Sequence, residues 1–144
     1  MAVSTYNPKD IKLVFGGFVA TGYADDSHLE VEALSDGITS KAGNDGEIVR
    51  SINPDQRHSI TLRLQQTSAF NDVLSQAYDI DRVTPGGVML PVAVVDLNGR
   101  TNFAAGQAWV TKKPNSEFGT EAGDREWVIH TGEPTVYNVG GANR

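Results

Sequence analysis

The sequence predicts a mainly β protein, a β-sandwich or partly closed β-barrel of about seven or eight strands with one flanking α-helix. The clearest evidence is residues 58–65, where apolar and polar side chains alternate as they do in a strand with one buried face. The apolar positions are Ile60, Leu62 and Leu64, and the polar positions are Ser59, Thr61, Arg63 and Gln65. A helical period appears directly after this strand, and the remaining chain consists of short apolar stretches separated by turn residues.

The N-terminal region is expected to begin with one long strand over Ile11–Tyr23. Its apolar side chains alternate on both sides of Gly16-Gly17, where backbone without Cβ atoms allows a strand to kink or bulge. A polar loop follows, and the alternation returns at Leu29–Ala33. Two strands joined in this way are expected to form an antiparallel pair.

Residues 35–57 form a long, loop-rich polar excursion. Turn signals at Ser35-Asp36-Gly37, Gly43-Asn44-Asp45-Gly46 and Asn53-Pro54-Asp55 flank brief strand candidates at Ile38-Thr39 and Glu47–Arg50. A polar stretch of this length in a compact domain is usually functional or disordered. This excursion is therefore the first candidate for a contact surface.

The helix is predicted from apolar side chains spaced i, i+3, i+4, i+7 and i+8, which place one apolar stripe on one side of a helix. These side chains are Phe70, Val73, Leu74, Ala77 and Tyr78. The helix is expected to begin near Thr67 or Ser68 and to extend over about Ser68–Tyr78. We expect it to pack on the β body through that stripe.

The C-terminal half is expected to consist of strands. Val88–Val95 is apolar throughout, which predicts a strand buried on both faces, and Asn98-Gly99 predicts a tight hairpin to a return strand at Thr101–Thr111. Further strands are predicted at Glu126–Thr131 and Thr135–Val139. The whole chain, 1–144, is expected to be one domain, with an N-terminal arm at 1–10 and a C-terminal tail at 132–144.

Composition and charge exclude several classes of protein. The net charge of −6 and the sequence pI near 4.9 repel nucleic acid phosphates, which argues against a DNA or RNA reader. The absence of cysteine excludes a disulfide framework and suits a reducing cytoplasm. We find no secretory signal at the N-terminus and no apolar run of the roughly 20 residues that span a bilayer, so no membrane insertion is expected.

The sequence carries no motif for catalysis. Neither Gly-x-Gly-x-x-Gly, a P-loop lysine nor Gly-x-Ser-x-Gly occurs, and the histidines His28, His58 and His130 are far apart in the sequence. Asp25-Asp26 with His28 is the best catalytic candidate, although ordinary solvated turns are the favoured interpretation of such acidic pairs. We therefore expect no enzyme, no cofactor and no metal site.

Taken in order, these features resemble the tail tube protein of contractile-tailed bacteriophages, which is related in design to the tube subunit of type VI secretion systems. Two stretches carry the resemblance most clearly. They are Asp10–Gly22, which contains the kinked first strand, and Arg63–Leu74, which joins the alternating strand to the helix. The likeness extends over most of the chain.

The resemblance implies a virion structural protein that self-assembles into hexameric rings, which stack into the inner tail tube. It implies as partners the tail sheath, tape-measure, baseplate and tail terminator proteins. Phage DNA would pass through the lumen without specific binding, which suits an acidic chain because like charges repel. The location implied is the phage tail, assembled in the cytoplasm of the bacterial host.

Two sets of residues are candidates for assembly. The ring-stacking candidates are Ile38, Thr39, Asn44, Asp45 and Glu47 of the excursion and Tyr6 of the N-terminal arm. The candidates for the lumen or for a wet sheet face are Ser59, Thr61, Arg63, Gln65, Glu30 and Glu32. These roles are what the resemblance implies, and the alternation at 58–65 places Ser59, Thr61, Arg63 and Gln65 on the wet face of a strand.

Two alternatives remain open. The first is a monomeric β-sandwich binding module for carbohydrate or peptide, with Trp109 and Trp127 as its contacts, although core packing or an interface anchor is the favoured interpretation of these tryptophans. The second is another tail component, such as a terminator or baseplate protein. A compact monomer would favour the first alternative.

Overall fold

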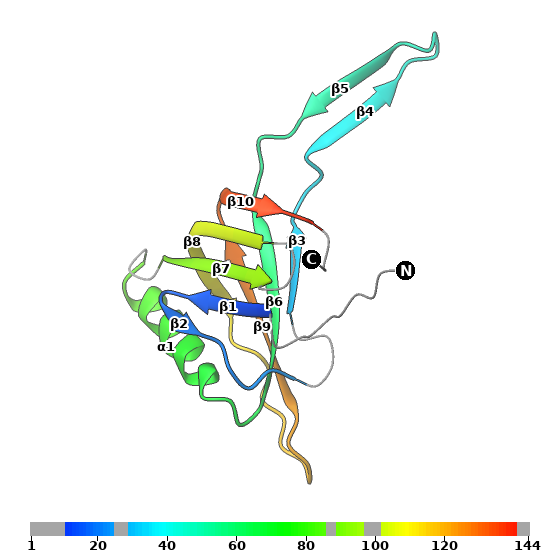
Figure 1. Cartoon of the computed structure of the whole chain (residues 1–144). Helices are drawn as coiled ribbons and strands as arrows, with labels where there is room; N and C mark the ends of the chain where they lie inside the picture. The colour runs from blue at the N-terminus through cyan, green and yellow to red at the C-terminus, as the bar shows by residue number, and fades with distance from the viewer. Residues whose placement is uncertain (1–10, 25–28, 86–88, 97–101, 141–144) are drawn as a thin grey trace, which may run out of the picture.

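The computed structural model describes residues 11–24, 29–85, 89–96 and 102–140, which form one α-helix and ten strands (Figure 1). The helix is α1 (Phe70–Val83). The strands are β1 (Ile11–Phe15), β2 (Phe18–Val19), β3 (Leu29–Ala33), β4 (Ile38–Ala42), β5 (Ile48–Ile52), β6 (His58–Gln65), β7 (Leu90–Asp96), β8 (Asn102–Lys112), β9 (Asp124–Thr131) and β10 (Pro134–Asn138). The mainly β fold with one helix is confirmed, and it has more strands than predicted.

Eight of the strands form one antiparallel sheet in the order β2-β1-β7-β8-β9-β6-β3, with β10 paired to β8. The long strand β8 is shared, because its N-terminal part pairs with β10 and its C-terminal part pairs with β9. Figure 1 shows β1, β7 and β8 crossing over β6, β9 and β3, so the sheet folds over on itself. Within the described residues its two end strands, β2 and β3, are not paired with each other, and the barrel stays open.

The first strand is not one bent strand, as predicted, but a hairpin of β1 and β2. Gly16 and Gly17 adopt φ of 59° and 89°, which reverses the chain so that Phe15 pairs with Phe18. A Cβ on Gly16 would lie 2.6 Å from Leu90 Cδ1, so the turn also needs glycine for space. The expected pairing of this strand with Leu29–Ala33 is wrong as well, because β1 pairs with β7 and β3 pairs with β6.

Strand β7 is buried on one face rather than on both. Val92 and Val94 point into the core, whereas Pro91 and Val95 are exposed on the other face. The prediction failed because both faces carry apolar side chains, which hides the alternation in the sequence. Strands β7 and β8 pair antiparallel, as the predicted hairpin requires. The turn predicted at Asn98-Gly99 lies outside the described residues.

The core lies between the two halves of the folded sheet and beneath α1. The alternating strand β6 supplies Ile60, Leu62 and Leu64, all fully buried, as the sequence predicts. The other large buried side chains are Leu13, Phe15, Phe103, Trp127, Ile129 and, from the helix, Phe70 and Leu74. Helix α1 packs on the sheet through its apolar stripe, mainly against β8.

The helix begins and ends later than predicted. Residues before it form a turn in which the Ser68 hydroxyl donates to the Thr21 carbonyl at 2.5 Å and accepts from the Phe70 N–H at 3.2 Å. At the C-terminus the apolar stripe ends near Tyr78, but the backbone stays helical to Val83. Thr84 leaves the helical region with ψ of 86°, because the following Pro85 disfavours helical geometry in the residue before it.

Asn71 joins the start of α1 to the sheet. Its Oδ1 accepts a 2.8 Å hydrogen bond from Nε1 of Trp127, whose side chain is 3% exposed. Its Nδ2 donates to the carbonyls of Gln65, at 3.1 Å, and Ser68, at 3.0 Å. The amide therefore satisfies a buried indole N–H and fixes the turn between β6 and the helix.

We predict that Asn71→Ala lowers the free energy of unfolding by about 1–3 kcal/mol, because it leaves the buried indole N–H of Trp127 without an acceptor. Urea unfolding monitored by tryptophan fluorescence measures this change. Asn115→Ala, at an exposed position before β9, is the matched control and should unfold like the wild type. Equal effects of the two substitutions would contradict the anchoring role of Asn71.

Candidate assembly surfaces

Strands β4 and β5 form a separate hairpin that projects away from the body of the molecule (Figure 1). We call residues 38–52 the arm. The pairing runs from Ile38 opposite Ile52 to Ala42 opposite Ile48. The Gly43 N–H donates to the Glu47 carbonyl at 2.8 Å and closes the turn. The sequence predicted only brief strands here, because the polar residues in the middle of both strands hide their periodicity.

The arm is an extension of the β3–β6 hairpin. The last pair of that hairpin is Ala33 with His58, and the Leu34 N–H then donates to the Arg57 carbonyl at 3.1 Å. Pairing resumes where the Asn53 N–H donates to the Gly37 carbonyl at 2.8 Å. The two chains therefore stay side by side from the body into the arm, with a short interruption between them.

The interruption is filled by four polar side chains, which we call the clasp: Ser35, Asn53, Asp55 and Arg57. The guanidinium of Arg57 binds Asp55 through two hydrogen bonds of 2.9 Å, and the Ser35 hydroxyl donates to Asp55 Oδ2 at 3.2 Å. The Asn53 side chain donates to Ser35 Oγ at 3.3 Å and to the Asp36 carbonyl at 3.2 Å. These bonds fix the direction in which the arm leaves the body.

The clasp also shifts two pKa values. Hydrogen bonds from Arg57 hold the pKa of Asp55 far below its ordinary value, and the same pairing raises the pKa of Arg57. Because the pKa of Asp55 is lowered by folding, its stabilising effect is present above its unfolded value of about 3.9 and is lost as the pH falls through the lower folded value. The clasp is therefore fully charged at neutral and mildly acidic pH.

The arm has one apolar face that the described chain does not cover. Directly opposite residues of an antiparallel pair share a face, so Ile38, Ile52, Ala42 and Ile48 lie on one side, with the pair Ser40 and Arg50 between them. Ile48 is 69% exposed and Ile52 is 78% exposed. The opposite face carries Thr39, Lys41, Val49 and Ser51.

The ring-stacking candidates of the excursion all lie on the arm and are exposed. Ile38 belongs to the apolar face, Thr39 to the opposite face, and Asn44, Asp45 and Glu47 to the turn or beside it. Asp45 has a local role, because its Oδ1 accepts from the Glu47 N–H at 3.1 Å. Tyr6 lies outside the described residues.

The candidates for a wet sheet face are brought together on the outer face of β3, β6 and β9. Glu30 pairs with Thr61 and Glu32 with Ser59, so the carboxylates share a face with the polar side of β6. Arg63 on the same face pairs with Glu126 of β9 at 3.1 Å. We call this surface the acidic face.

One member of that set is less exposed than expected. Ser59 is only 9% exposed, whereas Thr61 and Arg63 on the same side of β6 are half-buried. Gln65 is exposed at the far end of β6. Nearby on the face, burial and the charge of Arg57 lower the pKa of His130, so its neutral form is favoured.

The other half of the sheet carries an apolar outer face that the sequence did not reveal. A row of paired residues crosses five strands: Val19, Val14, Ala93, Ala104 and Val136. We call it the apolar row. Val19 is 52% exposed and Val136 is 45% exposed. The only sequence signal for it was the unbroken apolar character of β7, which we attributed to burial within the chain.

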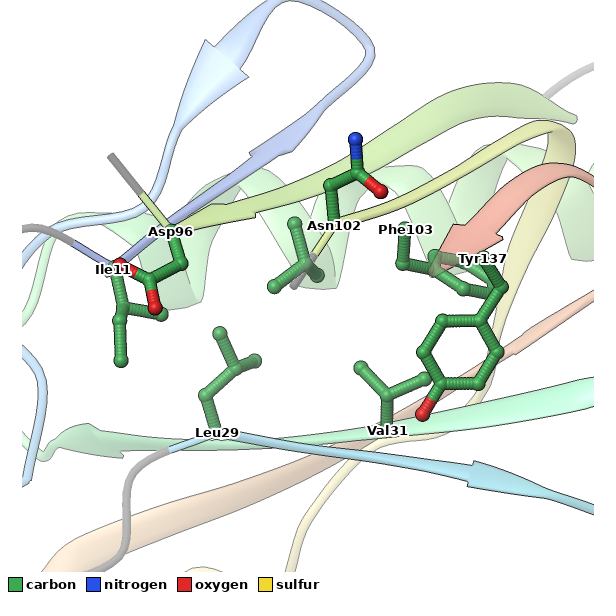
Figure 2. A pocket seen from close by; sticks show the side chains of 8 residues that line it. Ile11, Leu29, Val31, Asp96, Asn102, Phe103 and Tyr137 are labelled. Atoms are coloured by element: carbon green, nitrogen blue, oxygen red, sulfur yellow. The ribbon is translucent and has the colours of Figure 1, made fainter. Parts of the chain in front are cut away.

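A pocket of about 240 Å³ lies where the two halves of the sheet diverge (Figure 2). Leu29 and Val31 of β3 point into it from one side, and side chains of β1, β7, β8 and β10 line the other side. The latter are Ile11, Val94, Asp96, Asn102, Phe103 and Tyr137. Phe103, Tyr137 and His58 form an aromatic cluster with ring centroids 5.2–5.4 Å apart.

The described histidines and tryptophans do not form a site together. His58 pairs with Thr131 and its neighbour Ser59 pairs with His130, so the two histidines lie on opposite faces of the sheet. His28 and Asp25-Asp26 lie outside the described residues. Trp127 is buried in the core, whereas Trp109, paired with His130, lies on the other face. The two tryptophans therefore cannot form one sugar-binding platform.

The described residues contain no group of three or more His, Cys, Asp or Glu side chains placed to hold a metal ion. Among the described helices, none is long and apolar enough to span a membrane. The features that stand out are the arm, the acidic face, the apolar row and the pocket. All four are candidate contact surfaces.

Comparison with known proteins agrees with this description. Residues 5–136 match the model of the bacteriophage PhiTE tail tube protein family. The chain is 29% identical to structural protein ORF10 of Pseudomonas phage KPP10 over 144 residues, which cover 95% of this chain and 83% of that protein. In fold it resembles the tube-terminating cap of the anti-feeding prophage, with a TM-score of 0.58, 12% identity, and coverage of 94% of this chain and 93% of that chain.

We predict that Asp55→Asn loosens the arm without unfolding the body, because it removes the carboxylate that binds both Arg57 and Ser35. Amide hydrogen exchange should become faster in residues 38–52 and stay unchanged in β6 and β9. Asp36→Asn is the matched control, because only its backbone carbonyl takes part in the clasp. Unchanged exchange in the arm of the Asp55 variant would show that the clasp does not order it.

Proposed function

The chain belongs to the bacteriophage PhiTE tail tube protein family, and we propose that it forms hexameric rings that stack into the inner tube of a contractile phage tail. The family is one of phage structural proteins, and the tail tube is its place in the virion. The observation that carries the finer proposal is the arm, an ordered hairpin whose apolar face is exposed. An isolated two-stranded hairpin is marginally stable at best, so the exposed apolar face of the arm favours contact with a partner.

Ring formation is supported by the two sheet ends and the apolar row. The end strands β2 and β3 lie at opposite ends of the strand order and are unpaired on their outer edges within the described residues. A head-to-tail contact between different edges is heterologous and closes into a ring when the rotation between copies fits. In such a ring the edges that would promote aggregation become joints, and the apolar row is covered by the neighbour.

The conduit is proposed to be lined by the acidic face. Glu30 and Glu32 lie on the edge strand β3, next to the polar side of β6. Their charge repels the phosphates of DNA, so that DNA passes without specific binding. The net charge of −6 per chain multiplies around a ring and strengthens this repulsion.

Stacking of rings is proposed to use the arm, with the N-terminal residues around Tyr6 as a second contact. The remaining partners proposed are the tail sheath, the tape-measure protein, the baseplate and the tail terminator. The protein acts in the phage tail after assembly in the host cytoplasm. Within one chain over 1–144, the sheet forms the ring and the arm joins the rings.

A tube-terminating cap is the second candidate. It is favoured by the fold likeness to the cap of the anti-feeding prophage, which covers nearly all of both chains. A cap closes a tube and does not stack repeatedly on itself. Electron microscopy of the purified protein distinguishes the two functions, because a tube protein forms rings and long tubes whereas a cap forms only single rings or ends of tubes.

We predict that removal of the arm leaves rings but abolishes long tubes. Replacing residues 38–52 by a Gly-Gly link is feasible because Gly37 and Asn53 are already joined by a 2.8 Å hydrogen bond. Negative-stain electron microscopy measures the length of the assemblies. A link variant that still forms long tubes would contradict the stacking role of the arm.

We predict that Glu30→Lys combined with Glu32→Lys makes assembled tubes retain short DNA duplexes at low salt and release them as salt rises, because phosphate binding by lysine is salt-dependent. Cosedimentation of tubes with labelled DNA measures retention. Glu117→Lys with Glu121→Lys, in the exposed segment between β8 and β9, changes the net charge equally and is the control. Equal retention in both variants would contradict a lumen lined by the acidic face.

A further inference from the structure

The described residues leave the pocket beside β3 as an unfilled extension of the core. Leu29 and Val31 lie opposite Leu62 and Ile60, so their side chains face the same interior as the buried side of β6. Val94 and Phe103 on the other side are themselves core residues. Protein interiors are packed with few voids larger than a water molecule. An apolar gap of about 240 Å³ that continues the core is therefore a place for side chains from elsewhere.

The size of the pocket indicates what kind of group fills it. Small-molecule sites usually measure about 300–1,000 Å³, whereas an engineered cavity of about 150 Å³ takes a single benzene ring. At about 240 Å³ the pocket fits one or two aliphatic side chains. Its lining is mostly apolar, and its polar groups are those of Asp96, Asn102 and the Tyr137 hydroxyl.

The arm carries the complementary arrangement. Its apolar face places Ile48 and Ala42 near the tip and Arg50 two residues further along β5 on the same side. The pocket combines apolar walls with one carboxylate, and the arm combines aliphatic side chains with one guanidinium. Arg50 makes no hydrogen bond or ion pair within the described part of the chain, apart from backbone pairing in the hairpin.

We propose that the pocket receives Ile48 from the arm of a second copy of this chain, with Arg50 placed against Asp96. The occupant is a second copy because the clasp holds the arm pointing away from its own body (Figure 1). The five paired residues of β4 and β5 give the arm a reach of about 17 Å beyond its base. A contact between an arm and a pocket on different parts of the subunit is heterologous, and repeated it builds an open stack.

The proposal rests on the arm as the stacking element and adds the surface that receives it. It also explains the aromatic cluster beside the pocket. Tyr137 packs edge-on against both Phe103 and His58, which makes that wall of the pocket rigid before the arm arrives. A preformed wall lowers the ordering cost of docking.

Cysteine crosslinking tests the contact directly, since the chain has no native cysteine. Full-length Ile48→Cys protein is mixed with full-length Val31→Cys protein, assembled and oxidised. A disulfide forms only where Cα atoms approach within about 4.4–6.8 Å. The expected result is a linked dimer of the two variants. Val49→Cys, on the opposite face of the arm, is the matched control and should lose that product when mixed with Val31→Cys.

A charge test uses the same readout. Arg50→Glu in the Ile48→Cys chain brings a second anion to Asp96, and it should slow crosslinking to Val31→Cys. Lys41→Glu, an equal charge change on the opposite face of the arm, should leave the rate unchanged. Equal slowing by both substitutions would overturn the pairing of Arg50 with Asp96.

Electron microscopy of the same samples separates this proposal from the proposed function. Long tubes without the linked dimer would overturn docking in the pocket while stacking stands. Equal products from Ile48→Cys and Val49→Cys would also overturn it, because docking presents only one face of the arm. A linked dimer confined to Ile48→Cys would support docking even in a sample that contains no tubes.

Discussion

The pairing of β6 with β9 is the contact on which the rest of the structure depends. All eight residues of β6 are in register with β9, from His58 opposite Thr131 to Gln65 opposite Asp124. One side of this pair supplies the centre of the core, and the other side carries the acidic face. A slip of one residue would exchange the two sides and expose the core side chains. The register of this pair therefore sets both the stability and the outer chemistry of the subunit.

The same register positions the arm. Because β3 pairs with β6 on its other edge, the β3–β6 hairpin continues directly into the clasp and then into β4 and β5. The body supplies a rigid base, but the arm itself buries nothing within the chain. Its order comes from backbone pairing and from the polar side chains of the clasp. The arm is thus the part of the subunit whose stability depends most on contact with a partner.

The sequence predicted which face of a strand or helix is buried better than it predicted which strands pair. The alternation of β6 identified Ile60, Leu62 and Leu64 as core, and the helical stripe identified α1, because side-chain periodicity reflects burial directly. Which strands pair is decided by contacts distant in the sequence, so the partner of β3 was predicted wrongly. The turn at Gly16-Gly17 and the end of α1 before Pro85 depend on local backbone conformation, which the pattern of apolar residues does not reveal.

The candidate surfaces could be predicted from the sequence only in part, for a different reason. The sequence predicted two parts of the acidic face, because polar and apolar residues alternate in both β3 and β6. It did not predict that the pairing of β3 with β6 brings the two parts together. The apolar row and the pocket were hidden, because the sequence does not distinguish apolar residues on an outer face from apolar residues of the core. Val14 and Ala93 look no different from Leu13 and Val92. The apolar residues left uncovered by the described fold are what supports the proposal of assembly.

In the proposed rings, repulsion between acidic subunits opposes assembly, and burial of apolar side chains favours it. The relative magnitudes of these two effects decide whether the subunits assemble. Two exposed charges about 10 Å apart in water repel by about 0.4 kcal/mol, and salt at physiological strength weakens this further. Full burial of one valine or isoleucine side chain contributes about 1.5–3 kcal/mol. Covering one exposed valine of the apolar row or one isoleucine of the arm therefore outweighs the repulsion of several such charge pairs. In the proposed tube, an acidic lumen is compatible with assembly because the proposed contacts are apolar.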